Sequence, residues 1–468
     1  MIRPAPLLAA LLLAGCTLPG PRAALPPQAA FVPPPGWRAA IGPDAGGARP
    51  IEAQWWRAFG DAELDALVAR ALANNTDIAL AAERVEEARA AEALGRAQSL
   101  PQVNGQVAGT GGQTLGPLGS PSDAVSAQPA LVASFDTDLF GRLRLASRAA
   151  RAQLLASEAA ADTVRLAVAA QTASGYITLR ALDQRLAIAR DTLAARAEAL
   201  RIARRRYETG YSARLELRQA EAEYAATQQL VPAAELAITR QENALARLTG
   251  DAPRAIGRGQ AIDRLAEPAI PDGLPADLLR RRPDLFQAEQ ALVAADLTLD
   301  SQRAAMLPNL TLTGTAGVAL STALADPVGL LNAGGSILAP LFDGGRLRAQ
   351  EQVATARRDQ AAIAYRGVAL TAFREVEDAL AGVARSQEQA RDFAAQAEAA
   401  SGALENASAR YRAGYSAYIE QLDAQRNLLT AQLSLVQAFA DELTSYVALY
   451  QAMGGGWSAA EIEAVNRP

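Results

Sequence analysis

The sequence predicts a mainly α-helical chain that also carries a few membrane-crossing β-strands and is built as an internal twofold repeat. Three observations predict this fold: motifs that recur at a nearly constant offset, two very long stretches without proline, and short Gly-rich segments with alternating hydrophobicity. Half of the 468 residues are hydrophobic, but only 5% are aromatic. This composition is typical of long helices that pack closely through small side chains.

The charged residues exclude several classes of function. The chain contains no histidine, which excludes histidine-based catalytic triads and zinc sites. All the positive charge is arginine, the formal net charge is −5, and the arginines are interspersed with acidic residues. Such a distribution lacks the basic patch of a nucleic-acid-binding protein. We therefore expect no nucleic-acid partner, no metal site and no cofactor.

The N-terminus has the features of a signal peptide over residues 1–15. Arg3 supplies a positive start, and the apolar run at 4–13 is too short to span a bilayer as a helix. The following Leu-Ala-Gly-Cys resembles the lipobox of bacterial lipoproteins, which implies cleavage and acylation at Cys16, and Thr17 after it implies sorting to the outer membrane. The alternative, a buried cysteine, would not need these flanking residues.

Residues 16–60 are rich in proline, which predicts a lipid anchor followed by an extended tether. Beyond the tether the chain repeats itself. The segment YETGYSA that starts at Tyr207 returns as YRAGYSA at Tyr411, an offset of about 204 residues, and GRLR at Gly141 returns at Gly345. We therefore expect repeats at 61–250 and 276–457, an equatorial linker at 251–275 and a tail at 458–468.

Each repeat is expected to contain one very long helix. Residues 141–208 and 345–412 contain no proline, and at ~1.5 Å per residue each could run ~100 Å. In the first stretch, small and apolar residues recur at spacings of three and four, as in a coiled coil, and only Arg196 interrupts them.

Each long helix is followed by turn residues that predict a tight helical hairpin. Gly210 and Gly414 can adopt the left-handed conformation that ends a helix, and Ser212 and Ser416 are expected to cap the helices that return. The returning helices span about 213–249, with a kink at Pro232, and 416–453. Shorter helices at 61–98 and 276–306 have the right length to stack end to end with them.

Four segments have the character of strands. They lie at about 102–113 and 127–139 in the first repeat, and at about 309–318 and 335–342 in the second. Each is about the ten residues that a tilted strand needs to cross a bilayer. Strands buried in a soluble sandwich would look similar. Their place at the far end of a hairpin, in a secreted lipoprotein, favours membrane-crossing strands.

Four strands cannot close a barrel by themselves. An open sheet edge in lipid leaves backbone groups unpaired, at a cost of several kcal/mol each. Two copies would give a barrel of ~8 strands filled by its own side chains, whereas three copies would give ~12 strands and an aqueous lumen. The pattern therefore predicts an oligomeric pore, which the helices would continue into the periplasm.

Several motifs resemble the TolC-like outer-membrane factors, specifically the lipoprotein branch that serves resistance-nodulation-division multidrug pumps. The resemblance covers nearly the whole mature chain and implies a homotrimer with a 12-stranded outer-membrane β-barrel and a long periplasmic α-helical barrel. It also implies that the trimer contacts outer-membrane lipid, docks to a periplasmic adaptor protein and an inner-membrane resistance-nodulation-division transporter, and conducts drugs or other small molecules passively. The motifs are WWxxFxD from Trp55, RRPDL from Arg281, LDAQR from Leu422 and GGGW from Gly454.

The resemblance also implies two kinds of site. Asp423 and Ile419 match the positions at which the family closes its periplasmic end, where three carboxylates on one axis would repel one another and attract cations. The alternative is that Asp423 is a solvated helix position. The hairpin tips match the regions that contact the adaptor, although these residues could serve only the turn: Gly210, Tyr211, Ser212, Gly414, Tyr415 and Ser416.

Three other functions remain open from the sequence. A duct for type I protein secretion would differ only in its partners, and the lipobox favours small-molecule efflux. A periplasmic adaptor would have one hairpin and a β-domain, so the twofold repeat disfavours it. The chain is not expected to be an enzyme, because carboxylate pairs such as Glu86-Glu87 fit a helix surface and no phosphate-binding loop accompanies them.

Overall fold

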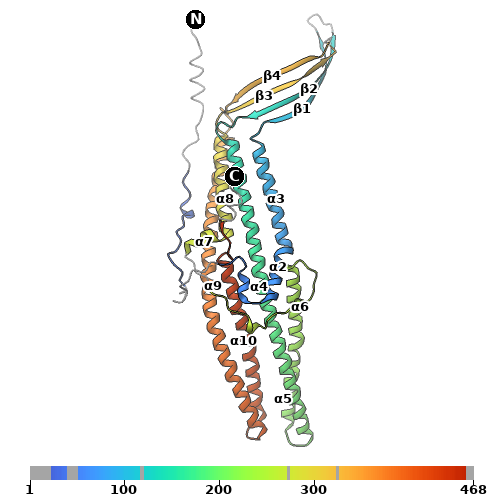
Figure 1. Ribbon diagram of the computed structural model, residues 1–468, viewed down its shortest axis with the longest axis vertical. Helices are drawn as coiled ribbons and strands as arrows, with labels where there is room; N and C mark the ends of the chain where they lie inside the picture. Colours follow the sequence, from blue (N-terminus) through green and yellow to red (C-terminus); the bar gives the residue numbers. More distant parts are fainter. Residues whose placement is uncertain (1–22, 39–50, 116–120, 271–274, 323–325, 460–468) are drawn as a thin grey trace. The chain divides into compact units, whose positions relative to one another are not determined.

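The computed structural model describes residues 23–38, 51–115, 121–270, 275–322 and 326–459 (Figure 1). Cys16, the expected lipidation site, lies outside these residues, as do the signal peptide and most of the tail. The chain divides into two compact units. Of the described residues, unit 1 comprises those within 23–31, 84–158 and 287–367, and unit 2 comprises the others.

Unit 1 contains one antiparallel sheet of four strands in the order β1-β2-β3-β4 (Figure 1). The strands are β1 (Gln102–Leu115), β2 (Pro121–Asp136), β3 (Asn309–Ser321) and β4 (Val328–Leu338). The two middle strands, β2 and β3, come from different repeats and pair through contacts such as Leu131↔Ala316. The strands that the first and second repeats contribute therefore form one continuous sheet.

The last strand differs from the range expected from the sequence. We expected it at about 335–342, whereas β4 begins at Val328 and ends at Leu338. Pro340 explains the early end, because proline has no N–H to donate to a strand ladder. Similarly, β2 ends at Asp136 rather than near residue 139, because Asp138 has a positive φ of 49°.

The sheet has two open edges within the described chain. β1 pairs only with β2, and β4 pairs only with β3, so the outer backbone groups of both strands have no strand partner in this sheet. Side chains on these strands include exposed apolar residues, among them Val107, Leu331 and Ile337. Edges of this kind can pair with strands of another chain.

Two long helices confirm the prediction from the proline-free stretches. α4 (Arg142–Glu208) and α9 (Arg346–Arg412) each contain 67 residues. Both begin after a carboxylate that accepts helical N–H groups: Asp138 accepts from Leu143 at 2.9 Å, and Asp343 accepts from Leu347 at 2.9 Å. These bonds satisfy donors that the first turn of a helix leaves without a partner.

The remaining helices are shorter than expected because several are interrupted. The first shorter helix divides into α2 (Ala62–Asn74) and α3 (Thr76–Ala97), and its equivalent divides into α7 (Pro275–Arg281) and α8 (Pro283–Ala304). The first returning helix divides into α5 (Arg214–Gln228) and α6 (Leu230–Leu248) close to Pro232, whereas α10 (Tyr418–Ala452) is continuous. Among the described residues, no helix combines the length and the hydrophobicity needed to cross a membrane.

The breaks between α2 and α3 and between α7 and α8 lie at equivalent positions of the two repeats, and both bind the end of a returning helix. Between α2 and α3, Asn75 Nδ2 donates to the carbonyl of Leu248 at 2.9 Å. Between α7 and α8, Arg282 Nη1 donates to the carbonyl of Ala452 at 2.9 Å. Each break therefore holds the C-terminal end of its own returning helix, through a different side chain but with the same geometry.

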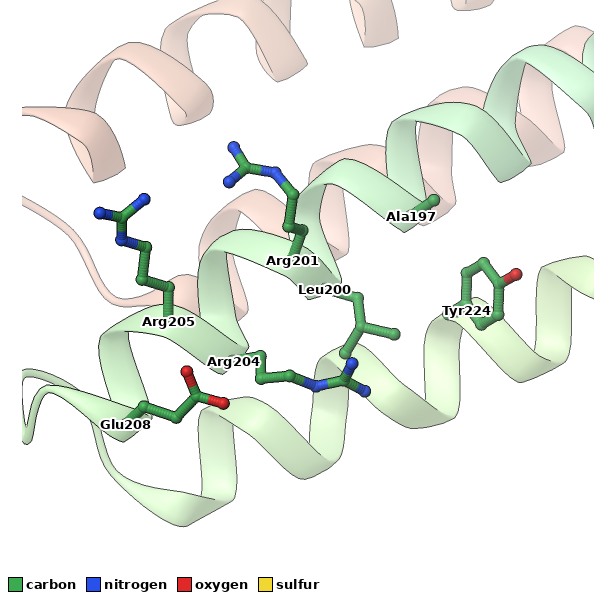
Figure 2. A pocket seen from close by; sticks show the side chains of 7 residues that line it. All are labelled: Ala197, Leu200, Arg201, Arg204, Arg205, Glu208 and Tyr224. Carbon is green, nitrogen blue, oxygen red and sulfur yellow. The ribbon is translucent and has the colours of Figure 1, made fainter.

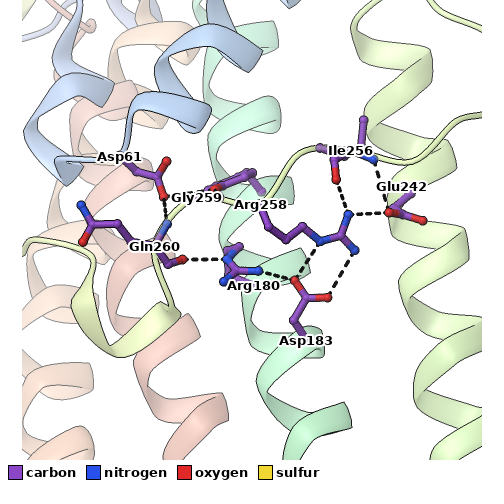
Figure 3. A network of polar contacts seen from close by, with 9 residues as sticks. Asp61, Arg180, Asp183, Glu242, Ile256, Arg258, Gly259 and Gln260 are labelled. Atoms are coloured by element: carbon purple, nitrogen blue, oxygen red, sulfur yellow. Dashed lines mark hydrogen bonds and ion pairs between the residues drawn. The ribbon is translucent and has the colours of Figure 1, made fainter.

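The linker between the repeats is held in unit 2 by a polar network (Figure 3). The Arg258 guanidinium pairs with Asp183 at 3.0 Å and with Glu242, while the N–H of Gln260 donates to Asp61 at 2.8 Å. Asp61 also accepts a hydrogen bond from the hydroxyl of Tyr176 at 3.1 Å, so the linker, α2 and α4 share one buried carboxylate.

Residues 23–38 of the N-terminal tether contact α9 at several points. In unit 1, the guanidinium of Arg358 is 1% exposed and donates to the carbonyl of Ala23 at 2.8 Å. In unit 2, Trp37 contacts Phe373 with ring centroids 5.9 Å apart. The tether is therefore fixed by specific contacts along this part of its length.

Candidate functional site

The two hairpin turns have the same backbone geometry and lie at the same end of unit 2 (Figure 1). Gly210 has φ +70° and Gly414 has φ +78°, which confirms the predicted left-handed ends of α4 and α9. In each turn the next N–H reaches back to the helix: Tyr211 donates to the carbonyl of Arg206 at 2.7 Å, and Tyr415 donates to that of Arg410 at 2.9 Å. These bonds satisfy carbonyl groups at the helix ends.

The predicted serine caps were wrong. The residues in the N-cap position of α5 and α10 are Ala213 and Ala417, one residue later, and neither helix has a side-chain cap. The hydroxyls of Ser212 and Ser416 are instead buried, and neither has a hydrogen-bond partner in the described chain. Each serine side chain therefore occupies the inside of its turn, where it cannot reach the first N–H groups of the helix.

Large side chains project from both tips. Tyr211 is 88% exposed and Tyr415 is 80% exposed, and each is followed by an exposed aliphatic residue on the returning helix, Leu215 or Ile419. Exposed aromatic residues at matched positions are typical of surfaces that bind another protein.

Asp423 and Ile419 lie near the start of α10, and both are exposed. Their spacing of four residues places them on one face of the helix. An acidic ring and an apolar ring about one turn apart would result if copies of this face met around an axis.

An apolar cluster joins the two hairpins above the tips. Its buried members are small residues of the first hairpin and larger residues of the second, namely Ala203, Ala220, Tyr418 and Leu422, with Leu200 and Tyr411 packed against them. Alanine allows the helices of the two hairpins to approach closely. The sequence did not predict this contact, because spacing within one helix does not reveal which helix packs against it.

A polar group of three residues flanks the cluster. The hydroxyl of Tyr411 donates to the carboxylate of Glu216, and the guanidinium of Arg206 lies 4.8 Å from the centre of the Tyr411 ring. Burial and the neighbouring Glu216 raise the pKa of Tyr411, so this hydroxyl stays protonated and remains a donor.

A buried ionic network joins the hairpins a few turns further from the tips. Arg196 is 2% exposed, donates to Gln425 and lies 3.4 Å from the carboxylate of Glu223, which also accepts from Arg426 Nε at 2.9 Å. Burial lowers the pKa of Arg196 and the charge of Glu223 opposes that shift. The one charged residue in the predicted apolar seam was the signal for this network, because a buried arginine needs an anionic partner.

The first hairpin also has a basic groove between α4 and α5, with a volume of about 560 Å³. Figure 2 shows Arg204 and Tyr224 between the two helices, whereas the side chains of Arg201 and Arg205 extend from α4 away from α5. At the same repeat offset the second hairpin has Glu405, Ser408 and Ala409 in place of the three arginines. The two hairpins therefore share a turn but differ in charge.

One family model matches the chain twice, once in each of the two repeats. The family model for outer membrane efflux proteins matches residues 67–251 and again residues 274–455. The chain belongs to the outer membrane efflux protein family.

Relatives and solved structures agree with this family over almost the whole chain. The pyoverdine export outer membrane protein OpmQ of Pseudomonas putida is 35% identical over 462 residues, which is 96% of each chain. The solvent efflux pump outer membrane protein SrpC of Pseudomonas putida is 34% identical and covers 86% of this chain and 87% of its own. The structure of the outer-membrane channel OprN has a TM-score of 0.83 at 27% identity, covering 94% of this chain and 99% of that one.

Membership of the outer membrane efflux protein family establishes the class of function. The chain is the outer-membrane channel component of an efflux pump and reaches into the periplasm, and it is a transport duct rather than an enzyme. The predicted TolC-like fold, with four strands per chain and an internal repeat, is confirmed.

Proposed function

We propose that three copies of this chain form one passive duct, which carries small molecules from a periplasmic adaptor and a resistance-nodulation-division transporter to the exterior. The observation that carries this proposal is the four-stranded sheet with open edges at β1 and β4. Three such sheets joined edge to edge would close a barrel of ~12 strands, wide enough for an aqueous lumen. Acylation at Cys16 would anchor each copy in the outer membrane.

The residues proposed for the periplasmic gate are Asp423 and Ile419. Their shared exposed face on α10 supports this role, since three copies of that face around an axis would make an acidic ring and an apolar ring about one turn apart. The acidic ring would favour cations in the closed duct.

The gate is tested by single-channel conductance in planar bilayers. Asp423→Ala should raise the conductance and weaken cation selectivity, because it removes both bulk and charge from the constriction. The matched control is Gln219→Ala, at the equivalent position of the first repeat, which should leave the conductance unchanged. Equal conductance in the wild type and Asp423→Ala would contradict the gate assignment.

The tip residues are proposed to contact the periplasmic adaptor. Tyr211 and Tyr415 support this, because they are the large exposed side chains at the ends of both hairpins. Gly210, Gly414, Ser212 and Ser416 would then shape the turns that present them. Tyr211→Ala and Tyr415→Ala together should weaken pump-dependent resistance without lowering the amount of protein in the outer membrane.

The names of the relatives favour small molecules over secreted proteins as cargo. One relative is named for pyoverdine export and another for solvent efflux, at nearly the same identity to this chain. The cargo would therefore be selected mainly by the pump rather than by the duct. Deleting the gene should sensitise the cell to some members of a panel of dyes, detergents and antibiotics, and unaltered sensitivity to all of them would favour protein secretion instead.

A further inference from the structure

A pocket in unit 2 lies where three segments that are far apart in the sequence meet. Its wall is formed by the short 3-10 helix η2 (Trp55–Phe59), by α4 and by the glycine-rich segment that follows α10. Its volume is about 410 Å³, which is within the range of sites that bind small molecules. None of the residues that line it belongs to the proposed gate or to the hairpin tips.

The glycine-rich segment lines the pocket with backbone alone. A Cβ at Gly455 would overlap Leu166 and would lie 3.2 Å from Nε1 of Trp55, and both of these residues also line the pocket. The N–H edge of the Trp55 indole therefore lies next to the glycine side of the pocket.

The pocket has more hydrogen-bond donors than acceptors. Its carboxylate is already engaged, because Nε1 of Trp457 donates to Asp162 at 2.9 Å. Trp55 is 2% exposed and Trp56 is 7% exposed, yet neither indole N–H has a hydrogen-bond partner among the described residues. Since a buried indole N–H usually has a partner, these two donors are suited to an acceptor from outside the chain.

A cation and an apolar wall accompany the two indoles. Arg165 of α4 lines the pocket, is exposed and has no carboxylate partner within the described part of the chain. A guanidinium binds a carboxylate through two parallel hydrogen bonds, and such charge-assisted bonds are strong. The apolar wall consists of Leu72, Leu166 and Ala169. The pocket thus matches a ligand that carries an anionic acceptor on an apolar body.

We propose that this pocket binds a small organic anion in which a carboxylate is joined to an apolar body. The carboxylate accepts hydrogen bonds from Arg165 and from the indole N–H of Trp55, with Trp56 as a further donor. The apolar body packs against Leu72 and Leu166. The inference goes beyond the proposed duct, since it depends neither on the gate nor on the number of copies.

Binding at this place should stabilise the fold. The pocket joins η2, α4 and the end of α10, so a bound ligand holds together segments that separate when the chain unfolds. A ligand that binds only the folded chain raises its unfolding temperature. Thermal unfolding therefore gives a second measurement beside the binding isotherm.

The test is isothermal titration of the full-length lipidated protein in detergent, with 2-naphthoate as the probe. The probe should bind saturably and raise the unfolding temperature. The neutral 2-naphthalenemethanol has the same ring but no charge, so it should bind about tenfold more weakly or less, because it loses the hydrogen bond between two charged groups.

Two variants test the donors separately. Arg165→Gln should weaken binding of 2-naphthoate about tenfold and leave the weak binding of 2-naphthalenemethanol unchanged. Trp55→Phe keeps an aromatic ring, removes the N–H and should also weaken binding of 2-naphthoate. The matched control is Arg148→Gln, at an exposed arginine of the same helix outside the pocket, which should bind 2-naphthoate as the wild type does.

The result for Arg165→Gln is decisive, because this side chain is exposed and its replacement should leave the unliganded unfolding temperature unchanged. Equal affinities of the wild type and Arg165→Gln for 2-naphthoate would overturn the proposal, and so would the absence of saturable binding to the wild type. Neither result would affect the proposed duct, whose test is the number of copies in the complex.

Discussion

The two helical hairpins share one plan but have diverged in what their surfaces carry. Both have a 67-residue outgoing helix and a glycine turn with positive φ. The first hairpin has the buried Arg196 near its tip, a basic groove and an interrupted returning helix, whereas the second has a continuous returning helix that carries Asp423. The two repeats therefore share their helices and turns, and different residues at matched positions give the two hairpins different surfaces.

The largest expected effect concerns a feature that the two repeats share. Gly250 and Gly454 have positive φ, and a Cβ at either would overlap a backbone carbonyl, that of Asn74 or Arg281. Left-handed strain and overpacking together should lower the free energy of unfolding by about 3 kcal/mol for Gly250→Ala or Gly454→Ala. Thermal unfolding in detergent measures this loss.

The tip glycines provide the control for that prediction. Gly210 and Gly414 also have positive φ, but the space around them is open. Alanine there should cost only about 1 kcal/mol of backbone strain. Equal losses at the tips and at Gly250 and Gly454 would contradict the close packing of each returning helix against its break.

The next effect concerns the ionic network in which Arg196 and Glu223 of the first hairpin meet Arg426 of the second. Arg196→Ala should lower the free energy of unfolding by about 3 kcal/mol or slightly less, because Glu223 is left in a buried site with only the half-exposed Arg426. Arg196→Ala combined with Glu223→Ala should cost less than the sum of the two single changes. Additive losses would show that the two charges do not interact, and the exposed Arg385→Ala is the control.

A smaller effect should appear only at high pH, and again in the first repeat. Burial raises the pKa of Tyr176 to about 12, while its hydroxyl bonds to Asp61. Because this pKa is above the unfolded value of about 10, the stabilisation is complete below pH 10 and is lost as pH rises toward 12, at about 1.4 kcal/mol per unit. Tyr176→Phe should therefore flatten the fall in stability between pH 10 and 12.

The control for the pH prediction is the exposed Tyr211→Phe, which should leave the pH dependence of unfolding unchanged. Tyr446 has a pKa raised to about 12 by burial as well, so some slope should remain in Tyr176→Phe. An unchanged slope in Tyr176→Phe would contradict the buried bond to Asp61. The second repeat has Leu380 at the position equivalent to Tyr176, and its own buried tyrosine, Tyr446, lies on the returning helix instead.

The smallest effect concerns the contact between the two hairpins of one chain. Tyr411→Phe removes a hydrogen bond to a carboxylate inside the chain and should lower the stability of each copy by about 1.5 kcal/mol. Tyr207→Phe, at the equivalent exposed position of the first hairpin, is the control and should leave the stability of one copy unchanged. Equal losses in the two variants would contradict the stabilising hydrogen bond between Tyr411 and Glu216.

The sequence predicted the repeated parts of the fold and missed the details that depend on tertiary contacts. The long helices begin and end within one residue of the proline-free stretches, since proline and glycine act locally. Asn75, which caps α3, and Pro283, which begins α8, are local signals for the two breaks that the sequence analysis did not use. The carbonyls that Asn75 and Arg282 reach on other helices could not be predicted from the sequence. β4 was misplaced because its sequence does not alternate clearly, and its pairing with β3 sets its register.

For the candidate site, the turns were predictable but the inter-hairpin contacts were not. Gly210 and Gly414 follow from backbone chemistry, whereas the serine caps failed because the turn carries each serine inward. The partners of Arg196 lie on other helices, so the sequence could indicate only that such partners must exist.

The most direct test of the account is the mass of the purified, lipidated protein in detergent, measured by native mass spectrometry. The sheet with two open edges predicts a complex of three copies that persists on dilution. A stable single copy with its four strands protected from solvent would contradict the claim that neighbouring chains complete the channel.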